Sequence, residues 1–358
     1  MKRKFCLLLI AALVLTLVGG CSKKFDYDPL AGVETTTIAD DYGRDVKIPA
    51  SITRIAASGA TAQMILMTLV PDLLVGLSSS PTTDQMPYFP ESMWYLPTFG
   101  QFYGTKSNLN IEALIAAQPQ VIIDLGDPKD TGKNDMNSIY TQTGIPAFFF
   151  DGTLERLPET YRRLGKIFGR EEKAEKLASY IEETLRTAEE NSARIPQTEK
   201  LTVMFGTGAT GLACNAAGSS QADVIDIVGA VNAIRTDDIT NKGGGTTVGM
   251  EEVYNTEPDV ILLTAGGPYD TLAAGEWSGL RAVRTGKYYE IPNLPYNWMA
   301  SPPSVNRLLG VWWLGNLLYP DMYHYDMVAK AQEFYQLFWN YDLTEAEARA
   351  MLAKSTFK

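Results

Sequence analysis

The sequence predicts an α/β protein of two lobes, each with a mostly parallel central sheet, joined by one long rigid helix. Three observations support this fold class. Short apolar segments alternate with helical segments in both halves of the chain. A charged helical stretch with almost no turn residues fills the middle, at 171–194. A helix–proline–strand unit at 112–123 recurs at 251–262, a constant offset of 139 residues.

The first lobe is expected to span residues 35–156. It begins with a hairpin whose strands are 35–38 and 45–48 and whose turn is Tyr42-Gly43. Further strands are expected at 52–57, 121–125 and 146–150, and helices at 61–70, 111–118 and 136–143. This alternation indicates α/β units around a parallel sheet.

The bridging region is expected at 157–195, as helices over 157–168 and 171–194. In the second helix, apolar residues recur at spacings of three and four, as in a helix packed along a surface. Its length would be roughly 36 Å. The second lobe, 196–358, resumes the alternation and closes in helices. Its elements are expected at 201–205, 222–228, 250–255, 260–264, 287–291, 303–318, 326–339 and 345–353, the last opened by the capping box Thr344-x-x-Glu347.

The repeated unit is the evidence for two related lobes. Glu112 and Glu251 each begin a predicted helix, which stops before Pro119 or Pro258 because the residue preceding a proline disfavours the helical conformation. A buried apolar strand follows in both copies. Because the copies lie on either side of the long helix, each is expected to form the core of one lobe.

The first twenty residues have the pattern of a signal peptide. Three basic residues precede an apolar run at 5–18, which is too short for a comfortable transmembrane helix. Small residues then lead to Cys21, as in a bacterial lipoprotein whose cysteine is lipidated; an ordinary secretory signal is the alternative. A lipid on Cys21 would anchor the mature chain outside the cytoplasmic membrane, at the cell surface or in the periplasm, through a flexible tether at 21–34.

The composition argues against several kinds of binding site and cross-link. Without its signal peptide the chain keeps 28 basic and 42 acidic residues, a net charge of −14, which argues against nucleic-acid binding. The single histidine, His324, is expected in a surface loop and cannot build a multi-histidine metal site. No metal ligand set, cofactor or catalytic residue is predicted. With Cys6 removed and Cys21 lipidated, Cys214 is left alone and no intramolecular disulfide is possible.

Several motifs, in this order, are similar to those of one family. They are Asp41-Tyr-Gly-Arg-Asp-Val-Lys-Ile-Pro49 with Thr53-Arg-Ile-Ala56, the unit from Asn110 to Val121, the segment from Trp277 to Tyr289, and Ser301-Pro-Pro-Ser-Val-Asn-Arg-Leu308 with Trp313 and Pro320. Together they resemble, over roughly residues 37–340, the substrate-binding lipoproteins of ATP-driven importers for iron–siderophore, haem and cobalamin complexes.

The resemblance implies a monomeric receptor that binds its ligand in a cleft between the lobes and delivers it to a permease dimer with its ATPase, without bond chemistry. An iron–siderophore is the leading ligand, followed by haem or a corrinoid. A molybdate- or tungstate-type oxyanion is the alternative. One histidine favours a preassembled complex over a bare zinc or nickel ion, since those ions prefer imidazole.

In that family, a glutamate at the head of each helix–proline–strand unit meets arginines of the permease. The motif match assigns this role to Glu112 and Glu251. The alternative, which does not exclude docking, is that both carboxylates stabilise helix N-termini.

Candidate ligand-binding residues lie in loops after strands or carry aromatic rings. In the first lobe they are Ser58, Thr61, Tyr88, Trp94 and Tyr103. In the second lobe they are Thr207, Asn215, Thr246, Tyr296, Asn297, Trp298 and Arg307. The rings could stack on a planar ligand or pack in the core. Arg307 could face an anionic ligand or form a buried ion pair.

Two other classes of protein compete with a receptor. Gly206-Thr-Gly-Ala-Thr-Gly211 satisfies G-x-G-x-x-G after a predicted strand, as in a nucleotide-dependent oxidoreductase, but no helix opens directly after it. A surface lipoprotein without a transport role, built on the same scaffold, is the third class.

Overall fold

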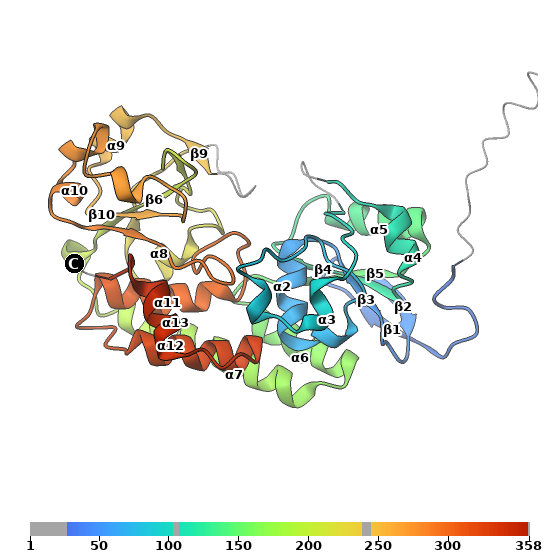
Figure 1. The fold of residues 1–358 in the computed structure, drawn as a ribbon. Coiled ribbons are helices and arrows are strands. Elements are labelled where there is room, and N and C mark those ends of the chain that lie inside the picture. Colours follow the sequence, from blue (N-terminus) through green and yellow to red (C-terminus); the bar gives the residue numbers. More distant parts are fainter. Residues whose placement is uncertain (1–26, 103–106, 238–244, 357–358) are drawn as a thin grey trace, which may run out of the picture.

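The computed structural model describes residues 27–102, 107–237 and 245–356, which form two lobes with separate sheets (Figure 1). The predicted signal peptide, Cys21, residues 22–26 of the predicted tether, and Tyr103 lie outside these residues. We call the lobe that contains β3–β5 the N-lobe and the lobe that contains β6 the C-lobe.

The N-lobe opens with the predicted hairpin, β1 (Thr35–Ala39) paired antiparallel to β2 (Asp45–Pro49). The Asp40 carboxylate accepts hydrogen bonds from the backbone N–H groups of Tyr42 and Arg44, and Gly43 adopts a φ of +68°. Asp40 also pairs with the Arg44 guanidinium at 2.6 Å. These contacts explain why the chain reverses at the predicted turn.

A parallel sheet with strand order β3-β4-β5 forms the centre of the N-lobe. Its strands are buried and almost wholly apolar, as expected for a parallel sheet covered on both faces. The strands are β3 (Ile55–Ala57), β4 (Val121–Gly126) and β5 (Ala147–Asp151). The helices are α2 (Ala60–Leu69), η1 (Pro71–Leu73), η2 (Met86–Tyr88), α3 (Glu91–Trp94), α4 (Ile111–Ala116) and α5 (Gly132–Thr143).

Two helices connect the lobes, as predicted. α6 (Leu157–Phe168) ends at Gly169 with a φ of +63°, and α7 (Glu171–Ser192) follows directly. The 22 residues of α7 extend about 33 Å. α7 packs against α6 and against α8 and α11 of the C-lobe, along the lower side of the molecule (Figure 1). Its apolar stripe faces inward, so a single rigid element supports both lobes.

The C-lobe contains a second, mostly parallel sheet. Its parallel strands are β6 (Thr202–Thr207), β8 (Val231–Asn232), β10 (Val260–Leu263) and β11 (Tyr288–Glu290), and β7 (Ala213–Cys214) and β9 (Thr246–Thr247) extend it antiparallel. Its helices are η3 (Gln197–Glu199), α8 (Asp223–Ile227), α9 (Met250–Thr256), η4 (Tyr269–Thr271), η5 (Glu276–Gly279) and α10 (Arg281–Arg284).

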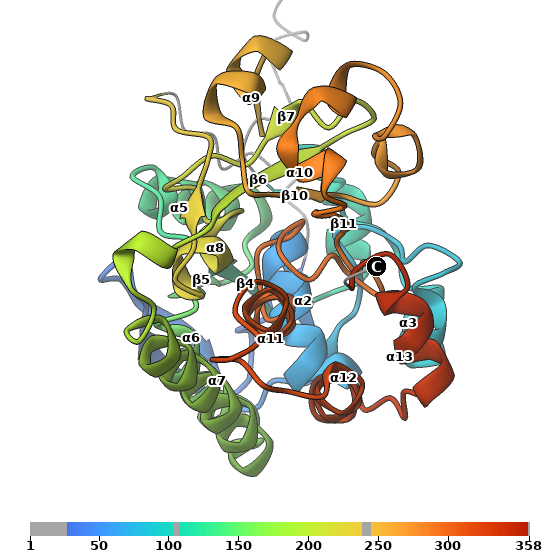
Figure 2. The same cartoon turned by 90° about the vertical axis from the view of Figure 1, so that its left-hand side faces the viewer.

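Four helical segments close the chain: α11 (Asn306–Leu318), α12 (Met327–Phe334), the π-helix η6 (Tyr335–Trp339) and α13 (Glu345–Leu352). α11 and η6 pack against α7, α12 packs on α11, and α13 packs on α12, on the side away from α7 (Figure 2). α11 is buried along almost its whole length. The predicted capping box is confirmed: the Thr344 hydroxyl accepts from the Glu347 N–H, and the Glu347 carboxylate accepts from the Thr344 N–H.

The repeat is visible in atomic detail. Gln118 and Glu257, 139 residues apart, both take positive φ values, +47° and +38°, directly before the prolines. Two residues later, the Gln120 side chain accepts from the N–H groups that precede β3, while the Asp259 carboxylate accepts from the N–H of Thr202. The first unit supplies β4, between β3 and β5, and the second supplies β10, between β11 and β6. The prediction of two related α/β lobes is therefore confirmed.

Some predicted boundaries were wrong. β3 starts at Ile55 instead of residue 52, because the N–H groups of Thr53 and Arg54 bond to the Gln120 side chain instead of a neighbouring strand. α5 starts four residues early, at Gly132, where a side chain would collide with the Tyr42 ring. The expected helix at 326–339 is an α-helix continued by a π-helical turn.

Candidate functional site

The loops that follow the N-lobe strands are held tightly together. After β3, the buried Ser58 hydroxyl donates to the Asp124 carboxylate of β4 at 2.6 Å. After β5, Gly152 donates its N–H to the Gly126 carbonyl, and a Cβ on Gly152 would lie only 2.7 Å from the Gly126 nitrogen. The Thr61 side chain lies against Gly126. Open α/β sheets bind ligands beyond the carboxyl ends of their strands. At this edge of the N-lobe sheet the loops are already held in place by hydrogen bonds and close packing.

On the C-lobe side, Arg307 forms a buried ion pair with Asp223, the first residue of α8. Arg307 is 1% exposed. Its Nη1 donates to the Asp223 carboxylate and to the Ser220 carbonyl, and its Nε donates to the Ser304 carbonyl. Of the two roles open for Arg307, the structure shows the ion pair.

Electrostatics link this ion pair to the N-lobe. Burial raises the pKa of Asp223 to about 6, the Arg307 guanidinium opposes that change, and the carboxylates of Glu155 and Asp127 raise the pKa further. Asp127 follows β4 directly and Glu155 follows β5 by a few residues. Asp223 of the C-lobe therefore lies within electrostatic reach of two carboxylates that follow strands of the N-lobe. We call the set of Asp223, Arg307, Asp127 and Glu155 the acidic site.

Tyr88 and Tyr296 lie in an aromatic contact between the lobes. Tyr88 packs against Tyr335 and Tyr341, with ring centroids at 5.6 and 4.8 Å. Tyr296 lies 5.9 Å from the ring of Phe89. Burial raises the pKa of both Tyr88 and Tyr296 to about 12, which disfavours a phenolate at either position. We call this contact, made by Tyr88, Phe89, Tyr296, Tyr335, Trp339 and Tyr341, the aromatic seam.

The remaining predicted aromatic and amide positions also have packing roles. The Trp94 indole donates to the Phe89 carbonyl at 3.1 Å. Trp298 is 1% exposed, and its carbonyl lies so close to α11 that a Cβ on Gly310 would approach within 2.3 Å. The Asn297 side chain accepts from the N–H groups of Met299 and Ala300. The contacts of Asn297 and Trp298 fix the chain between β11 and α11.

The G-x-G-x-x-G segment forms a β-hairpin. Gly208 and Gly211 both take a φ of +72°, and the chain returns as β7, antiparallel to β6. The Thr207 hydroxyl donates to the Ala213 carbonyl across this turn. A dinucleotide site needs a helix N-terminus after the glycines to receive the pyrophosphate. The hairpin occupies that place, so this segment does not form a dinucleotide site and gives the oxidoreductase alternative no support.

Asn215 and Thr246 continue this antiparallel extension. The backbone carbonyl of the buried Asn215 accepts from the Asn232 amide at 2.9 Å, and Thr246 pairs with Cys214 in the β7–β9 ladder. Ser58 and Thr61 thus lie at the ends of the N-lobe strands, whereas Arg307 lies in α11 and pairs with α8. It places Tyr88, Tyr296, Trp94 and Trp298 in packed contacts.

Comparison with known proteins agrees with this architecture. Residues 55–294 match the sequence model of the family described as periplasmic binding protein. The chain belongs to the periplasmic binding protein family. It is accordingly an extracytoplasmic solute-binding protein, and the family consists of transport proteins and not of enzymes. No protein of curated function matches the sequence.

Solved structures of similar proteins support the assignment of the chain to the periplasmic binding protein family. An ABC transporter solute-binding protein from Sulfurospirillum deleyianum is 27% identical with a TM-score of 0.81, over 88% of this chain and 99% of that one. A periplasmic solute-binding protein from Veillonella parvula is 26% identical with a TM-score of 0.74, over 90% and 98%. The molybdate-binding MolA of Haemophilus influenzae shares the fold at 17% identity and a TM-score of 0.68, over 86% and 99%.

Glu112 and Glu251 occupy equivalent places on the two lobes of this binding protein. Both are exposed in the first turn of their helices, α4 and α9, which lie on different lobes (Figure 1). A helix that precedes a parallel strand runs antiparallel to it, so its N-terminus lies near the carboxyl edge of the sheet. Each glutamate therefore lies toward the carboxyl edge of its own sheet.

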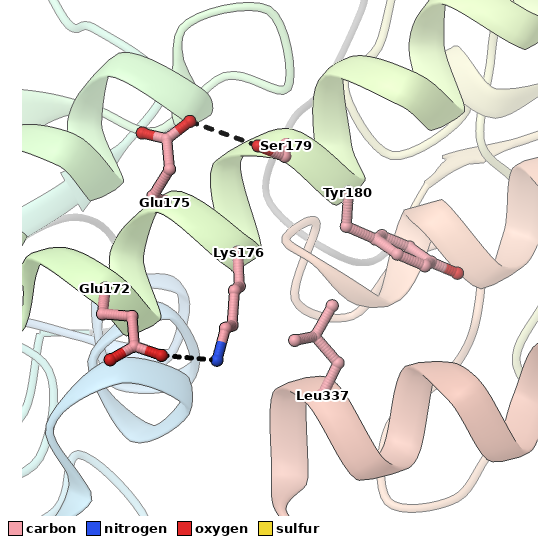
Figure 3. A pocket seen from close by; sticks show the side chains of 6 residues that line it. All are labelled: Glu172, Glu175, Lys176, Ser179, Tyr180 and Leu337. Carbon is pink, nitrogen blue, oxygen red and sulfur yellow. Dashed lines mark hydrogen bonds and ion pairs between the residues drawn. The ribbon is translucent and has the colours of Figure 1, made fainter.

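Two surface cavities lie away from the acidic site. One, of about 670 Å³, lies on α7, where Figure 3 shows Lys176 paired with Glu172 and Ser179 with Glu175 beside the Tyr180 ring. The other, of about 410 Å³, borders the aromatic seam; its lining includes Met67, Tyr88 and Trp339. Neither is lined by a residue of the acidic site.

Other predictions concern single residues. His324 is exposed in a loop, as predicted, with its Nδ1 3.3 Å from the Pro320 carbonyl oxygen. Cys214 is a buried free thiol.

Within the described ranges, no three His, Cys, Asp or Glu side chains are grouped to hold a metal ion. In the same part of the chain, no helix combines the length and apolar character needed to cross a membrane.

No motif of the sequence singles out Asp223 or Glu155, whereas Asp127 ends the loop 124–127, which follows a predicted strand and is a predicted part of the pocket. Asp223 is 84 residues from Arg307, and no local pattern joins the two. Asp127 and Glu155 stand shortly after predicted strands, and that position was the available signal. Their side chains acquire a common role only when the two lobes face each other.

Proposed function

We propose that this periplasmic binding protein is the monomeric, lipid-anchored receptor of an ATP-driven importer, and that it captures a metal complex between its lobes. The family match, together with the two separate and mostly parallel sheets, is the observation that carries the proposal. Open α/β folds bind small molecules beyond the carboxyl ends of such sheets.

The single histidine supports a preassembled complex as the ligand. A complex brings its own metal ligands, so the receptor needs only shape, hydrogen bonds and charge. An iron–siderophore is the first candidate, and haem or a corrinoid is the next. Because the molybdate-binding MolA has the same fold, an oxyanion is kept as the alternative.

The proposed partners follow from the exposed carboxylates and from the N-terminus. Glu112 and Glu251 would contact basic residues of a permease dimer, one glutamate for each lobe, because paired exposed charges steer and orient docking. A lipid on Cys21 would keep the receptor at the membrane where the permease lies. The similar Sulfurospirillum protein, described as an ABC transporter solute-binding protein, supports the importer.

Binding of purified mature protein to a ligand panel tests the proposal. The panel contains ferric siderophore complexes, haemin, cyanocobalamin and sodium molybdate, each titrated while intrinsic tryptophan fluorescence and native mass are recorded. We expect one metal complex to bind with a dissociation constant of micromolar or below and a stoichiometry of one. If every member of the panel fails to bind at that level, the receptor function is wrong.

A further inference from the structure

We propose that the cavity beside the aromatic seam is a second binding site and that it takes an aromatic carboxylate. We call it the seam cavity. Its volume of about 410 Å³ is within the range of small-molecule sites. Its lining includes none of the loops that directly follow the sheet strands, where the transported ligand is expected. The inference goes beyond the proposed function and does not depend on it.

The first step concerns the shape of the ligand. Most of the side chains that line the seam cavity are aromatic rings, methionines or prolines. The rings are those of Tyr88, Phe89, Phe338, Trp339 and Tyr341. Aromatic side chains offer faces and edges against which another ring packs favourably. A flat aromatic body therefore suits this lining.

The second step concerns the charge of the ligand. Among the described residues that line the seam cavity, Lys173 of α7 is the only one that carries a charge. Burial lowers the pKa of its half-buried ammonium; Asp72 opposes this change and Arg170 adds to it. In the same part of the chain the ammonium makes no hydrogen bond or ion pair, because Asp72 is paired with Arg170 at 3.1 Å. A carboxylate on the ligand would supply the missing counter-ion.

The third step concerns what binding would do. Three separate parts of the chain border the seam cavity: Met67 and Met93 on α2 and α3 of the N-lobe, Lys173 on α7, and Phe338 and Trp339 in η6. A molecule held there touches both lobes and the helix that supports them. It should stabilise the observed arrangement of the lobes, because a ligand stabilises the state to which it binds.

Titration of the purified mature protein with three naphthalene derivatives tests the inference. The probes are 2-naphthoate, 2-naphthamide and 2-naphthylmethylammonium, which share one ring system and carry a negative, no and a positive charge. We expect 2-naphthoate to bind with a Kd of about 100 µM or below, and roughly tenfold more tightly than the other two. Calorimetry measures the affinities, and quenching of tryptophan fluorescence reports binding beside Trp339. Saturating 2-naphthoate should also raise the melting temperature.

Substitutions of Lys173 locate the site. Lys173→Met should weaken 2-naphthoate about tenfold and leave 2-naphthamide within about twofold, which shows that the cavity is intact. Lys173→Glu should reverse the order, so that the cationic probe binds most tightly. Lys176→Met is the matched control, because it removes an exposed lysine of the same helix that pairs with Glu172 and does not line the seam cavity. It should change none of the three affinities.

Three results would overturn the inference: equal affinities of wild type for the three probes, a preference for 2-naphthoate that survives in Lys173→Glu, or no binding of any probe up to about 1 mM. All three leave the receptor function standing, because the panel of metal complexes tests that function separately.

Discussion

The guanidinium of Arg307 is buried and always charged, so the fold needs an anion beside it. Asp223 supplies that anion from α8, and the pair ties α8 to α11 close to the N-lobe. Arg307 could be singled out from the sequence, because it lies in a motif. Its partner could not, because a contact across 84 residues is set by packing and not by any local periodicity.

Replacing only one partner of this ion pair should lower the free energy of unfolding. Arg307→Met leaves the Asp223 carboxylate without its counter-ion, and we expect the free energy of unfolding to fall by about 3–5 kcal/mol. The double variant Arg307→Met/Asp223→Asn should lose less than the sum of the two single losses, because it leaves no isolated charge. Urea denaturation of the four proteins measures the coupling. Additive losses would show that the two side chains do not interact.

The raised pKa of Asp223 predicts a specific dependence of stability on pH. Its folded pKa, about 6, is above its ordinary value of 3.8, because the cost of burying the carboxylate exceeds the stabilisation that Arg307 gives it. The free energy of unfolding is therefore higher when this carboxyl is protonated. This stabilisation is complete below about pH 4 and is lost as the pH rises through about 6. Relative to Asp223→Asn, wild type should therefore lose about 1–3 kcal/mol between pH 4 and pH 7. A difference between the two proteins that is constant over this range would contradict the assignment.

At the scale of elements, the helix–proline–strand unit is the part of the fold that the sequence predicts best. It combines a helix start, a proline stop and an apolar strand in one short segment, so local rules suffice. The two-residue strands β7, β8 and β9 could not be predicted, because two residues have no periodicity. α3 could not be predicted for the same reason, because its four residues are too few to show a helical period.

The repeat predicts where glycine should stabilise the protein. Gln118 and Glu257 hold φ values of +47° and +38°, a region that costs a residue with a Cβ roughly 1 kcal/mol. Gln118→Gly and Glu257→Gly should therefore each raise the free energy of unfolding, by up to about 1 kcal/mol. Glu189→Gly, in the interior of α7, is the control and should lower it by about 1 kcal/mol. A loss of stability in both repeat variants would mean that their side chains matter more than their backbone conformation.

The heads of α4 and α9 carry the proposed docking surface. Reversing both charges, Glu112→Lys/Glu251→Lys, should abolish ligand uptake by cells while the purified protein keeps its ligand affinity within about twofold. The physical reason is that like charges would then face the permease arginines. Glu252→Lys reverses an exposed neighbour of Glu251 in the same turn and serves as the control. Uptake at the wild-type rate by the double variant would exclude this docking surface.

At the scale of the whole molecule, the lobes are joined twice. α7 supports them from one side, and the aromatic seam locks them through C-terminal residues. Gln85 of the N-lobe adds a hydrogen bond to the Pro295 carbonyl at 2.7 Å. The sequence predicts the first connection, because a long amphipathic helix has a visible period. It does not predict the second, because the seam joins aromatic residues that are far apart in the chain and could as well have lined the ligand site.

Two connections should make ligand capture nearly free of lobe motion. Spin labels placed on α5 and α9 should report a change in inter-lobe distance below about 2 Å when the ligand binds, within the range typical of preorganised complexes. Trp339, which packs on Phe89 at 5.5 Å, is the residue whose loss should release the lobes. In Trp339→Ala we expect a broader distance distribution without ligand, a narrowing on binding, and weaker affinity, because binding must then order the lobes.

Truncating a buried tryptophan also lowers the free energy of unfolding by about 3–5 kcal/mol, so the distances are measured well below the melting temperature. Tyr95→Ala, at a ring that is 85% exposed, should leave the distribution as in wild type. A distribution in Trp339→Ala that stays as narrow as in wild type would show that α7 alone holds the lobes, and that the aromatic seam is packing without a mechanical role.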